Sequence, residues 1–474
     1  MEELYNVLKF YNHKIFRESG KLFVYCANNT GLFEIDDRTS KLIQQEGKTY
    51  KAAYESVKNL FSFDEFNALI KDMADNYFIK NDKNDKIIAD SREVKLGNNI
   101  FSLTILLAQE CNMRCTYCYA EDGEYDDKGI MTIQTARKAI DFLIEHSGNN
   151  KNLSVVLFGG EPLLALPLIK ELVPYIRETE EKTGKKIQIN MTTNGTLITK
   201  DTENYLIDNH IHVQISIDGD KETHNSNRFF ANKVGSYDLI IQHTESMREK
   251  NLLSARATLT GKQLNECYTF DHLDSLGFHS IAIAPASNLL SEDDFEKLAQ
   301  EEIKFEKYFE HLVKAKEYKK AKKMKMVIGN LKKIHSGGMR NLACGVGRNM
   351  YAVDIHGDLY PCHRFVNEKE YVMGNVNDDV NKREDFINEI KFSKHNSCQD
   401  CWVQNLCLGH CPHENFSLTG NTTIPSPKIC AMAKSKFEEL IHIYLRLSPE
   451  EKNILFSKSQ YVPGKSEQIV DIVS

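Results

Sequence analysis

Short apolar runs that alternate with helical patterns dominate the middle of the chain. From Ala136 to Ile144, for example, apolar residues recur at the spacing of one helix face. Strands that alternate with helices predict a parallel α/β sheet, here a partial, TIM-like (β/α)6 barrel over residues 93–300. Such barrels carry their chemistry at the carboxyl ends of the strands. The predicted strands are Ser102–Leu107, Ser154–Phe158, Ile187–Thr192, Val213–Ile217, Ala255–Leu259 and Ser280–Ala284.

The N-terminal part of the chain has a different pattern. Two apolar runs, Lys21–Tyr25 and Leu32–Ile35, flank a turn-like sequence and predict a hairpin. Ser62 to Glu65 has the spacing of a capping box, which marks the start of a helix. Strands followed by short helices predict a winged-helix-like domain over residues 1–92. The polar stretch Asp82–Asn98 is predicted to be a linker.

After the predicted barrel the chain becomes charged and then rich in cysteine. Residues 301–343 are predicted to form a charged helical bridge. Its lysines between Lys314 and Lys325 indicate a solvated helix face, with a contact surface for an acidic substrate as the alternative. Residues 344–440 form a loop-rich, cysteine-rich domain, and residues 441–474 form a C-terminal tail that is mostly polar.

The composition excludes several classes of protein. The 474 residues include 60 Lys and Arg against 67 Asp and Glu, a formal net charge of -7, and 41% are hydrophobic. These values exclude a largely disordered chain and a nucleic-acid protein that works by whole-chain positive charge. The apolar stretch Leu103–Ala108 is too short to span a bilayer, and the polar N-terminus is not a secretory signal. We therefore expect a soluble, cytoplasmic protein with no nucleic-acid or membrane partner.

Cysteines change this picture, because ten of the 12 fall in two dense groups. In a reducing cytosol such groups indicate metal ligation rather than disulfides. The first group, Cys111, Cys115 and Cys118, follows the first barrel strand and can hold one metal centre from a loop. A zinc site would need a fourth ligand, which is not close in sequence. An iron–sulfur cubane held by three cysteines instead leaves one iron open to a ligand.

Polar, glycine-containing segments follow the next three strands and should therefore meet at the same barrel rim. Glycines let a ligand approach the backbone closely. A carboxylate such as Glu161 can accept hydrogen bonds from an ammonium group, and Ser216 and Asp218 can hold sugar hydroxyls. The segments are Gly159-Gly160-Glu161-Pro162, Thr192-Thr193-Asn194-Gly195 and Ser216-Ile217-Asp218-Gly219.

On these motifs, residues Ser102 to Ala284 resemble the radical S-adenosylmethionine (SAM) superfamily. The resemblance implies that Cys111, Cys115 and Cys118 hold a [4Fe–4S] cluster whose open iron binds SAM. Reductive cleavage of SAM then yields a 5′-deoxyadenosyl radical that abstracts a hydrogen atom from the substrate. The cofactor supplies that chemistry, and the protein supplies orientation and the exclusion of water.

The resemblance also implies which residues contact SAM. The segment after the second strand contacts the amino group, Ser216 and Asp218 bind the ribose, and Tyr117 lies by the adenine. Arg228 is expected to pair with the SAM carboxylate, with a surface salt bridge as the alternative. Asn225 departs from the His-Asp-x-x-Arg pattern of relatives. The predicted SAM-binding residues are Tyr117, Gly159, Gly160, Glu161, Pro162, Thr192, Asn194, Ser216, Asp218 and Arg228.

The second cysteine group lies in the C-terminal region. Its seven cysteines exceed any packing need, and by count they suit two zinc sites or two iron–sulfur clusters equally well. Spacing alone does not separate these alternatives. The spacing is Cys344-x12-Gly357-x4-Cys362, then Cys398-x2-Cys401-x5-Cys407-x3-Cys411-x18-Cys430.

This segment resembles the SPASM extension of radical SAM peptide-modifying enzymes, which holds two auxiliary [4Fe–4S] clusters, so three clusters are expected in all. The resemblance implies Cys398, Cys401, Cys407 and Cys430 for one auxiliary cluster and Cys344, Cys362 and Cys411 for the other. The incomplete cluster would bind a substrate thiolate, with water, Cys26 or Cys267 as the alternatives. Otherwise Cys26 and Cys267 suit buried packing positions, and His363, His410 and His413 suit packing behind the clusters.

Two features reduce the number of activities that the resemblance allows. Sulfatase-maturing relatives carry an Asp directly after the Gly-x4-Cys cysteine, whereas His363 occupies that position here, which disfavours that activity. Residues 1–90 resemble the recognition element of ribosomal-peptide maturation enzymes, which binds a leader peptide as an extra β-strand. A DNA-binding winged helix is the alternative. These residues carry 13 basic and 15 acidic side chains, without the basic excess of a DNA reader.

The resemblance therefore implies a peptide maturase of the sactipeptide or ranthipeptide type. It would join Cys sulfur to a carbon of an acceptor residue in a ribosomally made precursor, with the leader on the N-terminal domain. Its electrons would come from a flavodoxin- or ferredoxin-type reductant. The alternative enzyme forms carbon–carbon links or oxidises a side chain. A non-enzymatic electron carrier or redox sensor is a further alternative, which would need the cysteines but not Gly159–Pro162 or Asp218.

Overall fold

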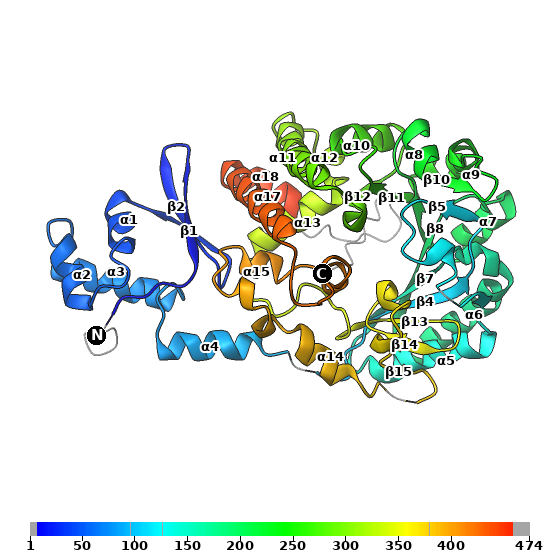
Figure 1. Cartoon of the computed structure of the whole chain (residues 1–474), viewed down its shortest axis with the longest axis horizontal. Helices are drawn as coiled ribbons and strands as arrows, with labels where there is room; N and C mark the ends of the chain where they lie inside the picture. Colours follow the sequence, from blue (N-terminus) through cyan, green and yellow to red (C-terminus); the bar gives the residue numbers. More distant parts are fainter. Residues whose placement is uncertain (1–6, 95, 126, 379, 458–474) are drawn as a thin grey trace. The chain divides into compact units, whose positions relative to one another are not determined.

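The computed structural model describes residues 7–94, 96–125, 127–378 and 380–457 (Figure 1). These residues form two compact units. Unit 1 lies within Met1–Val94, Val327–Cys344 and Ile390–Ser474, and unit 2 lies within Lys95–Met326 and Gly345–Glu389. In the described part of the chain, every helix is too short or too polar to cross a lipid bilayer.

Unit 2 is built on one large sheet with parallel strands at its centre, as the apolar runs predict (Figure 1). Neighbouring strands follow the order β12-β11-β9-β8-β7-β4. Leu103, Ile105 and Leu106 of β4 are fully buried, which is typical of a parallel strand covered on both faces. The predicted α/β fold with a parallel sheet is confirmed. The strands are β4 (Ser102–Gln109), β7 (Asn152–Gly159), β8 (Lys186–Thr193), β9 (His212–Ser216), β11 (Leu253–Leu259) and β12 (Ser280–Pro285).

The sheet continues beyond β4 with strands that the apolar pattern did not predict. β13 (Met350–Val353) comes from the cysteine-rich region and pairs in parallel with β4. β14 (Asp358–Tyr360) and β15 (Gly374–Asn375) then follow in antiparallel order. The short strand β6 (Gly129–Ile130) also pairs with β4. Part of the region predicted to be loop-rich therefore extends the central sheet.

Helices connect these strands, and their ends follow local sequence signals. α5 begins after Thr132, whose hydroxyl accepts a hydrogen bond from the backbone of Thr135. α6 ends at Gly184, which adopts a left-handed conformation. The helices are α5 (Ile133–His146), α6 (Leu166–Thr183), α7 (Lys200–Asp208), α8 (Lys221–Asn227), α9 (Tyr237–Glu249), α10 (Glu266–Ser275), α11 (Glu292–Lys314), α12 (Tyr318–Lys322) and α14 (Arg383–Ile390). α13 (Lys325–Ser336) follows α12 and lies mostly in unit 1. The 3-10 turns are η1 (Glu121–Gly123), η2 (Pro162–Ala165), η3 (Ser287–Leu289), η4 (His363–Phe365) and η5 (Lys369–Tyr371).

The lysine-rich stretch is helical, as predicted, and part of it is paired within unit 2. Lys320 of α12 lies 2.8 Å from Asp271 of α10. Lys323, directly after α12, lies 2.6 Å from Asp274 of α10. Lys320 and Lys323 are partly buried in these pairs, whereas Lys316, Lys319, Lys322 and Lys325 are exposed, as a solvated face requires.

Unit 1 contains a three-stranded antiparallel sheet in the order β1-β2-β3. β2 (Lys21–Cys26) and β3 (Gly31–Ile35) form the predicted hairpin, and β1 (His13–Glu18) is an additional strand. The helices of this region are α1 (Asp37–Ile43), α2 (Tyr50–Val57), α3 (Phe63–Asp75) and α4 (Asp82–Arg92).

The prediction of a linker at Asp82–Asn98 is wrong over most of its length, because α4 occupies Asp82–Arg92. The side chain of Asn81 accepts a hydrogen bond from the backbone of Asn84 and caps this helix. Ile88 of α4 is buried. A polar composition therefore concealed a helix that is held by its cap, by the buried Ile88 and by side-chain hydrogen bonds of Asn84 and Asp85.

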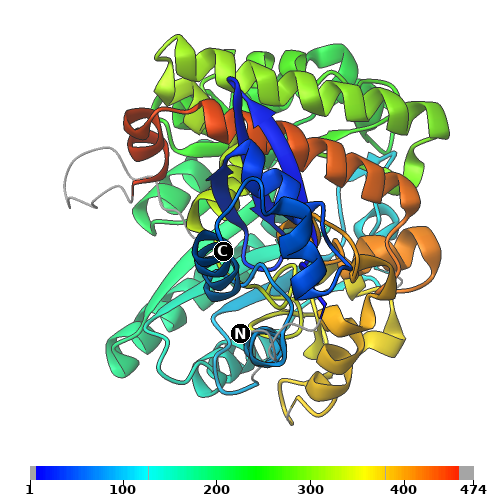
Figure 2. The same cartoon turned by 90° about the vertical axis from the view of Figure 1, so that its left-hand side faces the viewer.

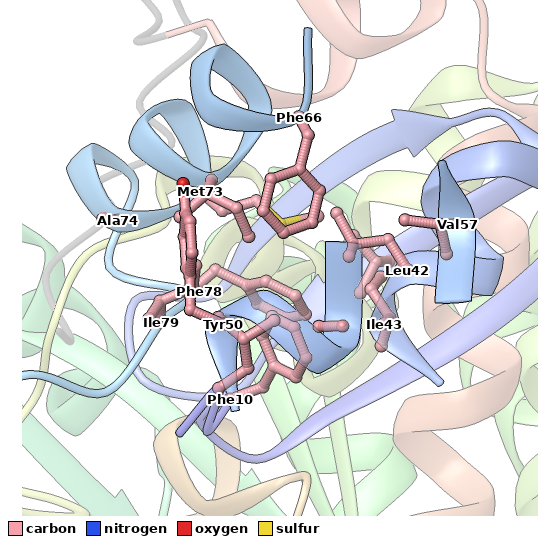
Figure 3. Packing of buried hydrophobic residues seen from close by; sticks show 14 of the residues in the cluster. Phe10, Leu42, Ile43, Tyr50, Val57, Phe66, Met73, Ala74, Phe78 and Ile79 are labelled. Atoms are coloured by element: carbon pink, nitrogen blue, oxygen red, sulfur yellow. The ribbon is translucent and has the colours of Figure 1, made fainter. Parts of the chain in front are cut away.

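One face of the N-terminal sheet packs on α1, α2 and α3 and forms a hydrophobic core (Figure 3). The predicted capping box at the start of α3 is confirmed, since Ser62 and Glu65 exchange side-chain and backbone hydrogen bonds. This start places Phe66, Ile70 and Met73 in the core. The helix start that the capping box sets is therefore also the one that places the apolar face of α3 in the core.

The other face of the sheet packs on the C-terminal part of the same unit (Figures 1 and 2). Phe16 of β1 and Tyr25 of β2 contact the ring of Trp402, with centroid distances of 5.8 and 5.9 Å. Lys14 of β1 pairs with Glu438 of α17 at 2.5 Å. The N-terminal sheet and the cysteine-rich segment around Trp402 therefore share one layer of side chains.

The C-terminal elements of unit 1 are short apart from one long helix. The long helix α17 continues into the predicted tail, and a further helix, α18, lies within that tail. The rest of that tail, residues 458–474, lies outside the described residues. The elements are η6 (Phe392–Lys394), η7 (Asn396–Cys398), α15 (Gln404–Cys407), α16 (Pro412–Thr419), α17 (Pro427–Arg446) and α18 (Pro449–Phe456).

Candidate functional site

The first cysteine group lies on the loop that leaves the carboxyl end of β4. A short antiparallel ribbon, β5 (Met113–Cys115) with β10 (Arg228–Phe230), shapes this loop. The ribbon places Cys115 directly opposite Arg228. The backbone N–H of Cys118 donates to the carbonyl of Cys115 at 3.2 Å, and that of Met113 donates to Sγ of Cys111 at 3.4 Å. The protein's own backbone therefore fixes the cysteine loop.

Two glycines let the end of β7 reach this loop. Gly159 has a φ of +134°, and a Cβ there would lie 2.1 Å from the carbonyl oxygen of Ala108. A Cβ at Gly160 would lie 2.2 Å from the carbonyl oxygen of Glu110. The backbone N–H groups of Gly160 and Glu161 donate to these two carbonyls at 2.8 Å. The glycines thus allow one part of the chain to approach another, whereas the sequence analysis explained them by the approach of a ligand.

Glu161 is fully buried and joins the ends of β7 and β8. Its Oε1 accepts hydrogen bonds from the hydroxyl of Thr193 at 2.7 Å and from the N–H of Leu163 at 3.0 Å. Its Oε2 accepts one from the N–H of Asn194 at 2.8 Å. Burial raises the pKa of Glu161, and these hydrogen bonds oppose that rise. Pro162 follows as the first residue of η2, a position whose N–H would have no partner within the helix, so the lack of an N–H in proline loses no hydrogen bond.

Asn194 links the end of β8 to the cysteine loop. Its amide donates to Oδ1 of Asn112 at 2.9 Å and lies 3.9 Å from Sγ of Cys111. Asn112 was not singled out from the sequence, although its place inside the cysteine motif is a signal that could have found it. Thr192 and Ser216 are half-buried at the carboxyl ends of β8 and β9. All these residues therefore lie at one edge of the sheet, as predicted.

Tyr117, Asp218 and Arg228 form a buried chain of hydrogen bonds. The hydroxyl of Tyr117 donates to Oδ2 of Asp218 at 2.6 Å, and the guanidinium of Arg228 donates to that hydroxyl at 2.7 Å. Oδ1 of Asp218 accepts from the backbone N–H of Thr258 at 3.1 Å. Burial raises the pKa of Asp218, and the positive charge of Arg228 opposes that rise. The structure thus brings together three residues that were predicted from separate motifs.

His224 forms hydrogen bonds that hold Asp218 and the backbone near Arg228 in place. Its Nδ1 accepts from the backbone N–H of Asp218 at 3.3 Å, so its Nε2–H donates to the hydroxyl of Ser236 at 2.9 Å. That hydroxyl donates to the carbonyl of Arg228 at 3.2 Å. Burial lowers the pKa of His224 well below its usual value and keeps the ring neutral. Asn225, at the departure from the family pattern, accepts a hydrogen bond from the backbone at the start of α9.

Two observations indicate that SAM and a cluster fit here. Nε of Arg228 is buried, and no described residue accepts a hydrogen bond from it. A buried guanidinium donor without a partner suits a carboxylate ligand. A Cβ at Gly123 would lie 2.5 Å from Cβ of Cys111, so the chain encloses the cysteine loop closely. Burial raises the pKa of the Cys111 thiol to about 12, and a metal that binds there must displace its proton.

Four cysteines of the second group come together in unit 1. Cys398 ends η7, Cys407 ends α15, and Cys430 lies in the first turn of α17. Cys398 interacts electrostatically with Cys401, Cys407 and Cys430, so the four thiols share one small region. Four soft sulfur donors fit an iron–sulfur centre, and they are the four that the resemblance assigns to one auxiliary cluster. In the described ranges, no three Cys, His, Asp or Glu side chains are grouped for a single metal ion.

Cys407 is surrounded by hydrogen-bond donors. Its Sγ accepts from the backbone N–H groups of Gly409 and His410 and from the imidazole of His410. Nε2 of that imidazole lies 2.9 Å from Oε2 of Glu414. Burial favours the neutral thiol, but these hydrogen bonds outweigh it and lower the pKa of Cys407. Burial also favours the neutral imidazole, but Cys407 and Glu414 outweigh it and raise the pKa of His410 to about 10.

The other cysteines of the second group are divided between the units. Cys344 and Cys411 belong to unit 1 and Cys362 belongs to unit 2, so their common cluster stays a prediction. Outside both groups, Cys26 is fully buried and its thiol donates to the carbonyl of Tyr77 at 3.5 Å. This contact suits the packing role that was predicted for Cys26.

The predicted packing residues near the cysteines have ordinary surroundings. The ring of His363 lies 4.8 Å from that of Phe158 and 6.2 Å from that of Tyr119. His413 is buried in α16, and Cys267 is half-buried in α10. Tyr119 directly follows Cys118, so His363 lies close to the first cysteine loop within unit 2.

Comparison with known protein families identifies two domains. Residues 105–276 match the radical SAM superfamily, and residues 344–402 match the SPASM iron–sulfur cluster-binding domain. The chain therefore contains a radical SAM domain and a SPASM domain. The predicted radical SAM and iron–sulfur character is confirmed at this level.

Similar proteins and structures agree with this assignment. The chain is 25% identical over 336 residues to the cysteine-type anaerobic sulfatase-maturating enzyme of Clostridium perfringens, covering 64% of this chain and 85% of that enzyme. It is 25% identical over 293 residues to the radical SAM cyclopropyl synthase TigE of Paramaledivibacter caminithermalis, covering 56% and 60%.

Two solved structures share the fold. One is anSMEcpe with bound AdoMet and the Cp18Cys peptide, with a TM-score of 0.62, 22% identity and coverage of 73% of this chain and 99% of that chain. The other is SuiB of Streptococcus suis bound to S-adenosylmethionine, with a TM-score of 0.50, 14% identity and coverage of 88% and 98%.

Proposed function

We propose that the chain is a radical SAM maturase that installs thioether cross-links between a Cys sulfur and a carbon of an acceptor residue in a ribosomally made precursor peptide. The observation that carries this proposal is the packing of a sheet with an open edge strand onto the auxiliary cysteine segment in unit 1. The sulfatase-maturating relative supports a substrate that is itself a polypeptide.

The leader of the precursor would bind along β3. Both faces of the N-terminal sheet are covered, and in the described part of the chain β3 pairs with β2 alone. Leu32, Phe33 and Ile35 are half-buried, so they offer apolar contacts beside unpaired backbone groups. An extended peptide that adds a strand gains affinity from main-chain hydrogen bonds and specificity from such side chains.

At the radical SAM site, the protein's role is to hold SAM. Nε of Arg228 pairs with the SAM carboxylate, and the open acceptor position on Oε2 of Glu161 receives a hydrogen bond from the SAM amino group. Ser216 and Asp218 bind the ribose, and Tyr117 lies by the adenine. When bound there, SAM and the cluster would supply the radical chemistry that removes one hydrogen atom from the acceptor carbon.

The overall reaction balances without a separate oxidant. One hydrogen atom leaves the acceptor carbon and becomes part of 5′-deoxyadenosine, and the thiol proton goes to solvent. When sulfur joins carbon, one electron remains, and an auxiliary iron–sulfur centre accepts it. A flavodoxin- or ferredoxin-type reductant supplies the electron that SAM cleavage consumes. Three [4Fe–4S] clusters would therefore be present, as the sequence resemblance implies.

A second candidate is a maturase that forms carbon–carbon links or oxidises a side chain. The relatives named as sulfatase-maturating enzyme and cyclopropyl synthase favour it, because neither name describes a thioether. Against sulfatase maturation, His363 stands where such relatives carry Asp.

An anaerobic mass spectrum separates these candidates. The reconstituted chain would be incubated with SAM, dithionite and a Cys-containing precursor encoded beside its gene. We expect a loss of two hydrogens per link, with the linked cysteines resistant to alkylation because their thiols are consumed. A precursor without its leader should remain unmodified.

Other outcomes of this experiment reject the proposal. The same mass loss with all cysteines still open to alkylation would favour the second candidate. No 5′-deoxyadenosine from a protein with intact clusters would instead indicate an electron carrier.

A further inference from the structure

The segment after Cys407 has an unusual backbone. Leu408, Gly409 and His410 all have positive φ angles, of +55°, +80° and +69°. A left-handed conformation is unfavourable for Leu and His and persists only where the surroundings hold it. Successive N–H groups in such a turn converge and form a concavity that binds anions. Here the N–H groups of Gly409 and His410 donate to Sγ of Cys407, and that of His410 also donates to the carbonyl of Cys407 at 3.2 Å.

The side chain of His410 completes this concavity. Its Nε2 lies 2.9 Å from Oε2 of Glu414, and its ring also forms a hydrogen bond with Cys407. The ring therefore lies between a sulfur and a carboxylate, which can both accept hydrogen bonds. Glu414 lies in the first turn of α16 and is mostly buried. A Cβ at Gly409 would lie 2.2 Å from Nδ1 of His395, so no side chain fits inside the turn.

Cys398 and Cys401 have fewer donors than Cys407. The hydroxyl of Ser397, an exposed residue, donates to Cys398, and the backbone N–H of Val403 donates to Cys401. In the first cysteine loop, Cys111 has one backbone donor and lies near the buried carboxyl group of Glu161. Donors to cluster sulfurs stabilise the reduced, more negative form and raise the reduction potential.

We propose that His410, oriented by Glu414, is a positioning residue that raises the reduction potential of the iron–sulfur centre on Cys398, Cys401, Cys407 and Cys430. This centre is then the one that accepts the electron left after bond formation. Reduction would add one electron to that centre and would form or break no bond of the His410 side chain. The inference rests on the proposed function for the presence of the cluster and for the source of the electron.

Potentiometric titration followed by electron paramagnetic resonance tests this assignment. The parent would be the full chain with Cys111, Cys115, Cys118, Cys344 and Cys362 replaced by Ala, which leaves the centre on Cys407. At the parent's midpoint, His410→Gly should lower the ratio of reduced to oxidised centre about tenfold, which corresponds to about 59 mV for one electron. Glycine tolerates the positive φ, so the substitution removes the ring without adding backbone strain.

Two further variants and a matched control sharpen the result. His410→Asn tolerates a positive φ and keeps an N–H donor near Cys407, so it should restore part of the ratio. Glu414→Gln should lower the ratio less than His410→Gly does. Ser397→Ala, which removes an exposed donor to Cys398, should change it little.

Each outcome bears on the inference. An unchanged ratio in His410→Gly, at the parent's iron content, overturns it and leaves the proposed function intact. If His410→Gly loses iron, the ratio of reduced to oxidised centre in Glu414→Gln is used instead. A lowered ratio in Glu414→Gln supports the inference, and an unchanged ratio overturns it. A parent with no reducible centre at these cysteines overturns both the inference and the assumed cluster.

Discussion

The cysteines at the end of β4 and those in the C-terminal part of unit 1 have different neighbours. Cys111 and Cys115 are held by a backbone ribbon, and burial raises the pKa of both thiols. Near them lie Glu161 and Arg228. Oε2 of Glu161 can accept a hydrogen bond from an amino group, and Nε of Arg228 can donate one to a carboxylate. Cys407 instead has donors that the chain itself supplies and that lower its pKa. These neighbours are the basis of our proposal that the first group binds a ligand and that the second holds and tunes an iron–sulfur centre.

The largest effect is expected when the cysteine loop after β4 is altered and the cysteines of unit 1 are left unchanged. Replacing Cys115 and Cys118 by Ala removes two thiolates from the SAM-binding loop, so reductive cleavage of SAM should fall to background. Iron bound by the cysteines of unit 1 should largely remain, because none of them is altered. Chromatography of 5′-deoxyadenosine together with iron analysis measures both quantities. Retained SAM cleavage in this double variant would contradict the assignment of the loop.

A smaller effect is expected at the guanidinium that was predicted to bind SAM. Arg228→Lys keeps the charge but loses the buried Nε–H and the fork geometry. A hydrogen bond to a charged group contributes about 1.5–3 kcal/mol, so the Kd for SAM should rise roughly 10- to 100-fold. Equilibrium dialysis under anaerobic conditions measures this change. Asn225→Asp, which restores the pattern of relatives and keeps the acceptor, serves as the control and should bind SAM as the parent does.

The close approach of β7 to the cysteine loop provides a test of stability. A Cβ in Gly160→Ala would clash with the carbonyl oxygen of Glu110, and overpacking of this kind costs about 1–3 kcal/mol. Gly329→Ala is the matched control, because nothing lies within 4 Å of a Cβ at that position in α13. Denaturant titration should show a lower free energy of unfolding for the first variant. For the control it should show an equal or higher value. Equal effects of the two variants would contradict the account of the glycines.

The smallest expected effect concerns the contact between β1 and α17 in unit 1. Burial opposes ionisation of Glu18, but hydrogen bonds from His442 and Arg446, each 2.9 Å long, outweigh it and lower its pKa. A lowered pKa adds stability above the unfolded-state value near 4.3, and this stability is lost as the pH falls below it. Glu18→Gln should therefore cost about 1 kcal/mol at pH 7 and less at pH 3.

Emission from Trp402, which packs on the neighbouring Phe16, reports this unfolding. Glu34→Gln is the control, because Glu34 is exposed and its ion pair is with the exposed Lys21. A pH-independent loss in Glu18→Gln would refute the explanation.

The sequence predicted best what depends on local pattern. The six parallel strands, the capping box at Ser62 and the residues of the buried chain around Tyr117 were all found from apolar runs, caps and motifs. The elements that it missed are defined by distant partners. β13 is recognised only by its pairing with β4, and α4 only by its cap and one buried face.

In the candidate site, too, contacts between residues far apart in the sequence could not be predicted. The hydrogen bonds of Glu161 to Thr193 and Asn194 could not be predicted from local pattern, because they join residues more than thirty positions apart. The contact of Tyr25 with Trp402 spans most of the chain and likewise has no local signal. Residue types could be predicted from motifs, whereas the partners of each side chain depend on the folded backbone.

The division of roles between the two cysteine regions is tested most directly by one substitution, Cys407→Ala. The variant would be incubated anaerobically with SAM, dithionite and the precursor peptide, and both 5′-deoxyadenosine and peptide mass would be measured. We predict that 5′-deoxyadenosine still forms while the peptide mass is unchanged. Cys267→Ala, outside both groups, should give the same cross-linked peptide as the parent. Cross-linking at the parent's yield in Cys407→Ala would contradict the role of the unit 1 centre.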